Sequence, residues 1–279
     1  MKSVLWFSIL IISACGNESV HSNPDLTQLS AEDRISDLEQ RVHELEITVH
    51  TLTTLIKVDT HKEQITLAGD LIVDGGNIQV QSGSGTTDGE TNGKGNLIIG
   101  YNEVPSNDGL GSTPGLRTGS HNLILGRGHA YNAHSTFMSG REHVVYSAYA
   151  AIVGGSESRV ASGFDGFSEF SGEGSVIVGG NKNDSTGKRC TILGGNEIHC
   201  RGELGTTLGG RYNRIDGPYS IAIGGELIGI NGTDNIGMGG HKVGIGGVRT
   251  IAIGGTNRAE YYDGNAHIES PTGEATISN

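Results

Sequence analysis

"GGRYNRIDGPYSIAIGGELIGINGTDNIGMGGHKVGIGGVRTIAIGG", residues 209–255, is the stretch that decides the fold. A glycine pair returns in it every fifteen residues, at 209/210, 224/225, 239/240 and 254/255. Self-similarity at a fixed period is typical of solenoids, in which each unit buries its apolar face against the next. We therefore expect a stack of similar coils.

The repeat has an internal pattern that predicts strands. We define position one of each unit as Gly180, Gly195, Gly210, Gly225, Gly240 or Gly255. Glycine also recurs at position eight (187, 202, 217, 232 and 247) and at position fifteen (194, 209, 224, 239 and 254). Apolar residues alternate with others around positions four to six and twelve to fourteen, which indicates two short strands per coil with glycine at the corners. Successive coils then pair in register, as parallel sheets.

The apolar columns predict what faces the core. We expect positions four, six, twelve and fourteen to point inward, the last represented by Ile223, Met238 and Ile253. Position thirteen then points outward, and its residues are mostly small: Ile192, Thr207, Ala222, Gly237 and Ala252. A solvent-facing column would carry charge, so this one predicts the close approach of another chain.

The repeat extends upstream with two insertions of about ten residues, where glycine spacings widen to 26 (100 to 126) and 25 (155 to 180). Residues 101–120 are rich in glycine and proline, and residues 163–174 hold Phe164, Phe167 and Phe170. Exposed aromatic loops often bind partners. The alternative is that these rings fold back onto the roll or onto an interchain axis.

Residues 30–59 predict a coiled-coil stalk. Apolar residues follow a strict three–four spacing: Ile35, Leu38, Val42, Leu45, Val49, Leu52 and Ile56. Arg34 and Arg41 occupy g positions, and Glu39 and Glu46 occupy the following e positions. β-Branched residues at a with Leu at d favour two strands, whereas "RISDLE" and "RVHELE" resemble a trimer-specifying pattern in which Arg covers the seam and pairs with Glu of a neighbouring chain. We expect three chains; the other alternative is one amphipathic helix packed on its own domain.

The N-terminus predicts export. Residues 1–14 combine Lys2, an apolar run and small residues, as a signal peptide does, and the run is too short to span a bilayer. "ISAC", ending at Cys15, resembles the bacterial lipobox, which implies lipidation of Cys15 and a membrane anchor. The alternative is a plain signal peptide with an incidental cysteine. Gly16 at the next position favours the outer membrane within this resemblance.

The fifteen-residue coils, such as "SIAIGGELIGING" and "TIAIGGTNRAE", resemble the heads of YadA-like trimeric adhesins. More closely, "NGKGNLIIGYNE" (92–103) and "LRTGSHNLILGRGHAY" (116–131) resemble the first coils of a group of exported bacterial proteins with this head type. The resemblance covers about residues 92–269 and implies a left-handed parallel β-roll, a trimer and a role in adhesion. Trimeric autotransporters carry a C-terminal membrane barrel, and we recognise no barrel strands here, so we expect the anchor at Cys15 instead.

We find no motif for catalysis, and we expect no enzymatic activity and no cofactor. His121, His129, His134 and His143 lie close in sequence, but no carboxylate or cysteine completes a metal-ligand spacing. Polar corners of the roll are the simpler explanation for these histidines.

Cys190 and Cys200 could form a disulfide, because cysteines outside the cytoplasm are oxidised. Positions eleven and six predict opposite facing, however, so the alternative of a buried thiol at Cys200 stays open.

The domain boundaries follow from these patterns. We predict a signal peptide (1–14), a linker from the lipidated cysteine (15–29), the stalk (30–59), a β-rich junction and loop (60–95), the head (96–269) and a tail (270–279).

The net charge of −12 opposes binding to nucleic acid. The expected function is adhesion to a glycan, a matrix component or a cell-surface protein by an outer-membrane lipoprotein with an exposed head; the alternatives are a structural spacer of the envelope and, remotely, a polysaccharide-degrading enzyme.

Overall fold

The structure, a computed structural model, describes residues 30–106, 116–161 and 172–254 and the backbone of three strands between 258 and 277. The chain divides into two units, one up to Asn77 and one from Ile78 onward, and each is described by itself.

The first unit contains one long helix, α1 (Ala31–Leu55), followed by a small hairpin. Ser30 caps the helix, because its hydroxyl oxygen accepts the amide of Asp33 at 3.2 Å. The helix ends four residues before the predicted boundary, since Ile56 is extended and begins strand β1 (Ile56–Asp59). β1 pairs antiparallel with β2 (Gln64–Leu67), and Asp59 stabilises the turn by accepting the amides of His61 and Lys62.

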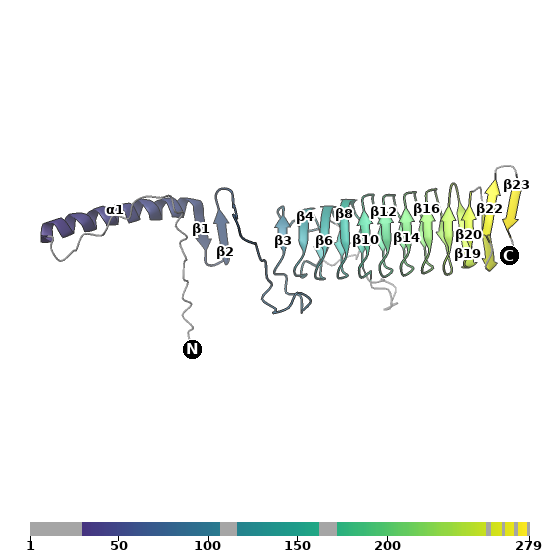
Figure 1. Cartoon of the computed structure of the whole chain (residues 1–279), viewed down its shortest axis with the longest axis horizontal. Helices are drawn as coiled ribbons and strands as arrows, with labels where there is room; N and C mark the ends of the chain where they lie inside the picture. Colours follow the sequence, from purple (N-terminus) through teal and green to yellow (C-terminus); the bar gives the residue numbers. More distant parts are fainter. Residues whose placement is uncertain are drawn as a thin grey trace. The chain divides into compact units, whose positions relative to one another are not determined.

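The second unit is a mainly parallel β-solenoid built from two sheets (Figure 1). The first sheet has twelve strands. They are β3 (Leu97–Ile99), β4 (Leu123–Arg127), β6 (Phe137–Arg141), β8 (Ala151–Ser156), β10 (Val176–Val178), β12 (Thr191–Leu193), β14 (Thr206–Leu208), β16 (Ile221–Ile223), β18 (Ile236–Met238), β20 (Ile251–Ile253), β22 (Ala266–Ser270) and β23 (Gly273–Ile277).

The second sheet has nine short strands and forms the other side of each coil. They are β5 (Ala130–Tyr131), β7 (Val144–Val145), β9 (Arg159–Val160), β11 (Asp184–Ser185), β13 (His199–Cys200), β15 (Arg214–Ile215), β17 (Gly229–Ile230), β19 (Val243–Val248) and β21 (Arg258–Asp263). The segment 270–279, expected to be a tail, contains β23, which pairs antiparallel with β22.

The predicted register is confirmed. Leu193 pairs with Leu208, fifteen residues on, and Ile223, Met238 and Ile253 form one column. The two insertions leave this stacking intact, because β3 pairs directly with β4 and β8 directly with β10.

The glycines at the corners have two roles. Gly194 at position fifteen has open space around it but a φ of +76°, which other residues rarely adopt. Gly217 and Gly232, at position eight, are needed for close approach of the coils. An added Cβ on Gly217 would lie 1.4 Å from the carbonyl oxygen of Gly232, and one on Gly232 would lie 1.9 Å from that of Gly247.

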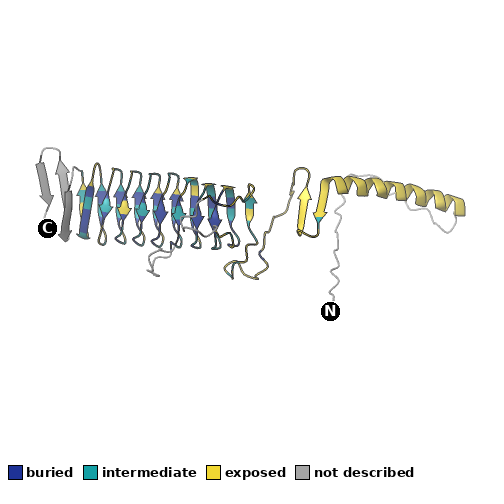
Figure 2. Cartoon of the chain, turned by 180° about the vertical axis from the view of Figure 1, so that it is seen from behind, coloured by how far each residue is buried: buried dark blue, intermediate teal, exposed yellow. Residues whose placement is uncertain are grey.

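The predicted facing of the first sheet is wrong. Position thirteen points into the core: Ile192, Thr207 and Ala222 are fully buried, whereas Leu193 and Ile253, at position fourteen, are about 40% exposed (Figure 2). Each of these strands has three residues, of which only the middle one is buried. The core comprises position thirteen together with positions four, six and eleven, which places Cys190 inside.

Small residues at position thirteen make room for large ones opposite, rather than for another chain. A Cβ on Gly237 would lie 2.9 Å from Cδ1 of Ile245 and 3.1 Å from Cγ2 of Ile228. In earlier coils the volumes are exchanged, with Ile177 at position thirteen and Ser185 at position six, both buried. In these coils a small residue on one sheet is accompanied by a large one on the other, which keeps the interior filled.

Residues 60–95, expected to be a β-rich junction and loop, contain only the strand β2, and residues 68–81 form none. The glycine-rich end of this segment packs on the first coil. Gly93 donates its amide to the carbonyl of Thr118 at 2.7 Å, and Asn92 donates its side-chain amide to the carbonyl of Ser82 at 2.9 Å.

Two glycines of the same coil provide a matched test of the corner argument. We expect Gly232→Ala to lower the free energy of unfolding of the head by about 1–3 kcal/mol or more, because of the positive φ and the contact with Gly247. Gly229→Ala, which has nothing within 4 Å, should change it by less than ~0.5 kcal/mol. Denaturant unfolding followed by circular dichroism measures both, and equal effects would contradict the argument.

Candidate interaction surface

The outer face of the first sheet is apolar along its whole described length. We define this apolar face by positions twelve and fourteen of each strand from β3 to β20. Its members are Leu97, Ile99, Leu123, Leu125, Phe137, Ser139, Ala151, Val153, Val176, Val178, Thr191, Leu193, Thr206, Leu208, Ile221, Ile223, Ile236, Met238, Ile251 and Ile253. Among these described strands only Ser139, Thr191 and Thr206 are polar, and none of the twenty is charged.

This face differs from the outer face of the second sheet. There the outward residues include Arg159, Asp184, His199 and Arg214. Arg159 donates two hydrogen bonds of 2.9 Å to the carboxylate of Asp184. Burial raises the pKa of Asp184, but the interactions with His199 and Arg159 outweigh it and hold that pKa below its usual value. The second sheet is thus suited to water, whereas a continuous apolar face of this kind marks an interaction surface in soluble proteins.

The corners beside the sheets carry solvent-exposed charges. Arg127 lies 3.7 Å from Glu142, and Arg141 and Lys182 lie 3.6 and 4.0 Å from Glu157. Exposed pairs of this kind contribute little stability. These charged residues lie at the edge of the apolar face and so mark where the candidate surface ends.

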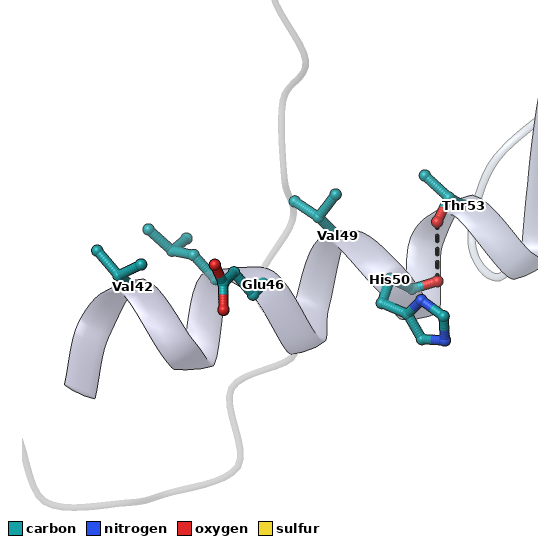
Figure 3. Close-up of a pocket in the computed structure, with 6 residues that line it drawn as sticks. Val42, Glu46, Val49, His50 and Thr53 are labelled. Atoms are coloured by element: carbon teal, nitrogen blue, oxygen red, sulfur yellow. Dashed lines mark hydrogen bonds between the residues drawn. The ribbon is translucent and has the colours of Figure 1, made fainter. Parts of the chain in front are cut away.

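The predicted stalk residues lie on one side of α1 and the following residue. Ile35, Leu38, Val42, Leu45, Val49, Leu52 and Ile56 are all exposed, between 40% and 63%. A shallow groove runs between Val42, Leu45, Glu46, Val49, His50 and Thr53, and Val42 and Val49 project from the same side of the helix (Figure 3). Arg41 lies 3.8 Å from Asp37 of its own helix. In the described residues no buried contact covers this seam.

Two of the four clustered histidines belong to the core. His129 and His143 stack with ring centroids 5.3 Å apart, and both are almost fully buried. His134 instead contacts the edge of Tyr149, and His121 accepts the amide of Ser82 through Nε2 at 3.1 Å. Within the described ranges, no group of three or more His, Cys, Asp or Glu is placed to hold a metal ion.

The buried histidines make the same hydrogen bonds to the backbone that asparagines make elsewhere in the same column. Nδ1 of His143 accepts the amide of Ser158 at 3.1 Å, and Nε2 lies 3.1 Å from the carbonyl of Ser139, four residues back. Asn213 repeats this arrangement, accepting the amide of Ile228 and donating to the carbonyl of Gly209. Both ring nitrogens are therefore used only if the imidazole is neutral with its proton on Nε2.

Cys190 and Cys200 form a disulfide inside the roll, with Cα atoms 6.2 Å apart. The expectation of opposite facing is wrong, because position eleven turns inward at the corner before β12, and both cysteines are fully buried. Gly205 accommodates the bridge, since an added Cβ would lie 2.6 Å from Sγ of Cys200. The pairing was open from the sequence because alternation does not describe corner residues.

Several predicted positions fall outside the described residues. These are Cys15 and the aromatic residues Phe164, Phe167 and Phe170, together with part of the insertion at 101–120. No described helix is long and apolar enough to cross a bilayer. Comparisons with protein-family models, curated proteins and solved structures found no match to this chain.

The buried histidines make stability pH-dependent. Burial, aided by the charge of neighbouring His129, lowers the pKa of His143 to about 4 from an unfolded value of 6.5, and burial lowers that of His129. The contribution of these histidines to the free energy of unfolding is then fully present above pH 6.5. It is lost as the pH drops toward 4, and for His143 the loss is on the order of 2–3 kcal/mol. We expect His143→Asn to keep the hydrogen bonds and weaken this dependence, whereas His143→Ala destabilises at every pH. Thermal unfolding between pH 4 and 8 measures this; an unchanged slope in His143→Asn would contradict it.

Proposed function

We propose that this protein is a lipid-anchored protein of the bacterial cell envelope that assembles into a trimer and uses a β-roll head to bind a surface. One observation carries the proposal: a single chain leaves two long apolar surfaces uncovered, the heptad seam of α1 and the apolar face of the first sheet.

The seam supports parallel self-association. Its residues repeat every seven positions, and each is about half exposed, so a lone helix would leave them in water. A groove with Val42, Leu45 and Val49 on its walls fits the side chains of a neighbouring helix. Arg34 and Arg41 at g, with Glu39 and Glu46 at e, favour three chains through interchain pairs. The exposed pair of Arg41 with Asp37 is weak enough to be exchanged for them.

The apolar face supports assembly of the head in the same trimer. Three copies that bury this face against each other would leave the charged second sheet toward solvent. Burial of side chains such as Leu193, Ile223 and Ile253 stabilises by about 25 cal/mol per Å². In this proposal the interchain contact is made by positions twelve and fourteen. The sequence had predicted it at position thirteen, which lies inside the coil instead.

The disulfide supports export. A disulfide such as Cys190–Cys200 is typical of proteins in an oxidising compartment such as the periplasm or the cell exterior. Together with the signal pattern and the lipobox-like "ISAC", this agrees with an anchor at Cys15 in the outer membrane.

Binding to a surface follows from multivalency. Three heads on one anchor raise the effective concentration of each contact, so weak single sites for a glycan, a matrix component or a cell-surface protein become effective together. The insertions at 101–120 and 163–174, with Phe164, Phe167 and Phe170, remain the predicted contact loops.

The trimer is tested by a charge placed on the seam. We expect the wild-type protein in mild detergent to sediment as three chains, and Leu45→Lys to shift it toward smaller species, because a lysine ammonium would be buried at d. Gln40→Lys introduces the same charge on the outer side of the helix beside Glu44 and should leave the mass unchanged. A single-chain wild type would contradict the proposal.

The location and role are tested on cells. We expect intact mass of the membrane fraction to show a lipid on Cys15, and protease added to intact cells to remove the head. We also expect the purified protein to bind immobilised matrix or glycan surfaces. A head protected inside the periplasm would contradict adhesion and favour a structural spacer.

A further inference from the structure

A segment between the helix and the head contains three short apolar pairs with i, i+2 spacing. They are Ile65/Leu67, Leu71/Val73 and Ile78/Val80, separated by Gly69 and by Gly75–Gly76. All six side chains are exposed, and so is Ile72, which lies between the members of the second pair. This alternation is typical of strands with one apolar face.

The backbone of this segment is as uncovered as its side chains. Only the first pair belongs to a strand, β2, which pairs with β1 alone. Within the described part of the chain, the amides and carbonyls of residues 69–80 have no hydrogen-bond partner, and residues 68–81 form no strand. An isolated two-stranded hairpin is marginal in water, so a single chain leaves this element incomplete.

We propose that residues 56–80 complete their sheet with the same residues of the neighbouring copies, forming an interchain β-junction. This inference rests on the trimer proposed above. β1 begins at Ile56, directly after the last residue of α1. A parallel coiled coil therefore brings identical residues of this segment to the same level in every chain, with the high effective concentration of a tether.

The chemistry of the segment fits another copy of itself better than a different partner. Pairing between copies satisfies the open amides and carbonyls. It also buries Leu71, Val73, Ile78 and Val80 against their equivalents. Asp70 and Asp74 are the only charged residues between 64 and 81, and each stands directly outside the second apolar pair, where a strand would leave it at an end.

Hydrogen exchange of the full protein tests the junction. We expect the amides of residues 70–80 to exchange roughly 100-fold or more slowly than in an unstructured chain. Leu71→Gln with Val73→Gln should return them toward the unstructured rate while the three-chain mass persists through the stalk. Ile72→Gln changes the opposite side of the same strand and should keep the protection.

Sedimentation of the same samples separates the outcomes. Three chains with fast exchange at 70–80 would overturn the β-junction and leave the proposed trimer intact, whereas a single chain would overturn both. Equal protection in the double variant and in Ile72→Gln, whether lost or kept in both, would contradict burial of the Leu71/Val73 face.

Discussion

The head depends on one constraint: successive coils must lie one strand spacing apart, about 4.8 Å, at every position, corners included. Strands meet this spacing easily through parallel ladders such as Thr191–Leu193 with Thr206–Leu208. Corners do not, because a side chain pointing at the next coil would fill the gap. The column of glycines at position eight removes this obstacle, as the short distances from Gly217 and Gly232 to the next coil show. Stacking in turn lets Asn213 and His143 each satisfy the amide of the following coil.

The same constraint explains the composition of the core. A coil of fixed length encloses a nearly constant volume, so an increase on one sheet requires a decrease on the other. Ile230 and Ile245 face Ala222 and Gly237, whereas Ile177 is accompanied by Ser185 in an earlier coil. The disulfide follows this rule as well, because Gly205, later in the same coil as Cys200, leaves space for the Cys200 sulfur. Core columns therefore vary in residue type along the stack, with small residues such as Gly237 lying against large ones such as Ile245.

Because the interior of each coil is already filled, the apolar columns on the outer face of the first sheet do not contribute to the core of a single chain. Val153, Val178, Leu193, Ile251 and Ile253 are exposed on the first sheet, as are the seam of α1 and the apolar pairs between residues 65 and 80. The second sheet shows that this chain can place charge outward where nothing covers it, as with the exposed Arg214. Three uncovered apolar elements along one chain have a common physical explanation in self-association, which is why we derive the proposed function from the surface and not from a pocket.

The sequence by itself determined the fifteen-residue stack, its register and the glycine corners, because these depend on local backbone requirements and on period. It did not determine which way the strands of the first sheet face. Leu193 and Ile223 are as apolar as any core residue, and alternation is the same whichever face is inside. Only the tertiary structure decided this, since the interior is already filled by positions four, six and eleven and holds just the middle residue of each strand, such as Ile192. It also paired Cys190 with Cys200 and placed His129 and His143 inside, because corner residues turn inward in a way that a period of two cannot describe.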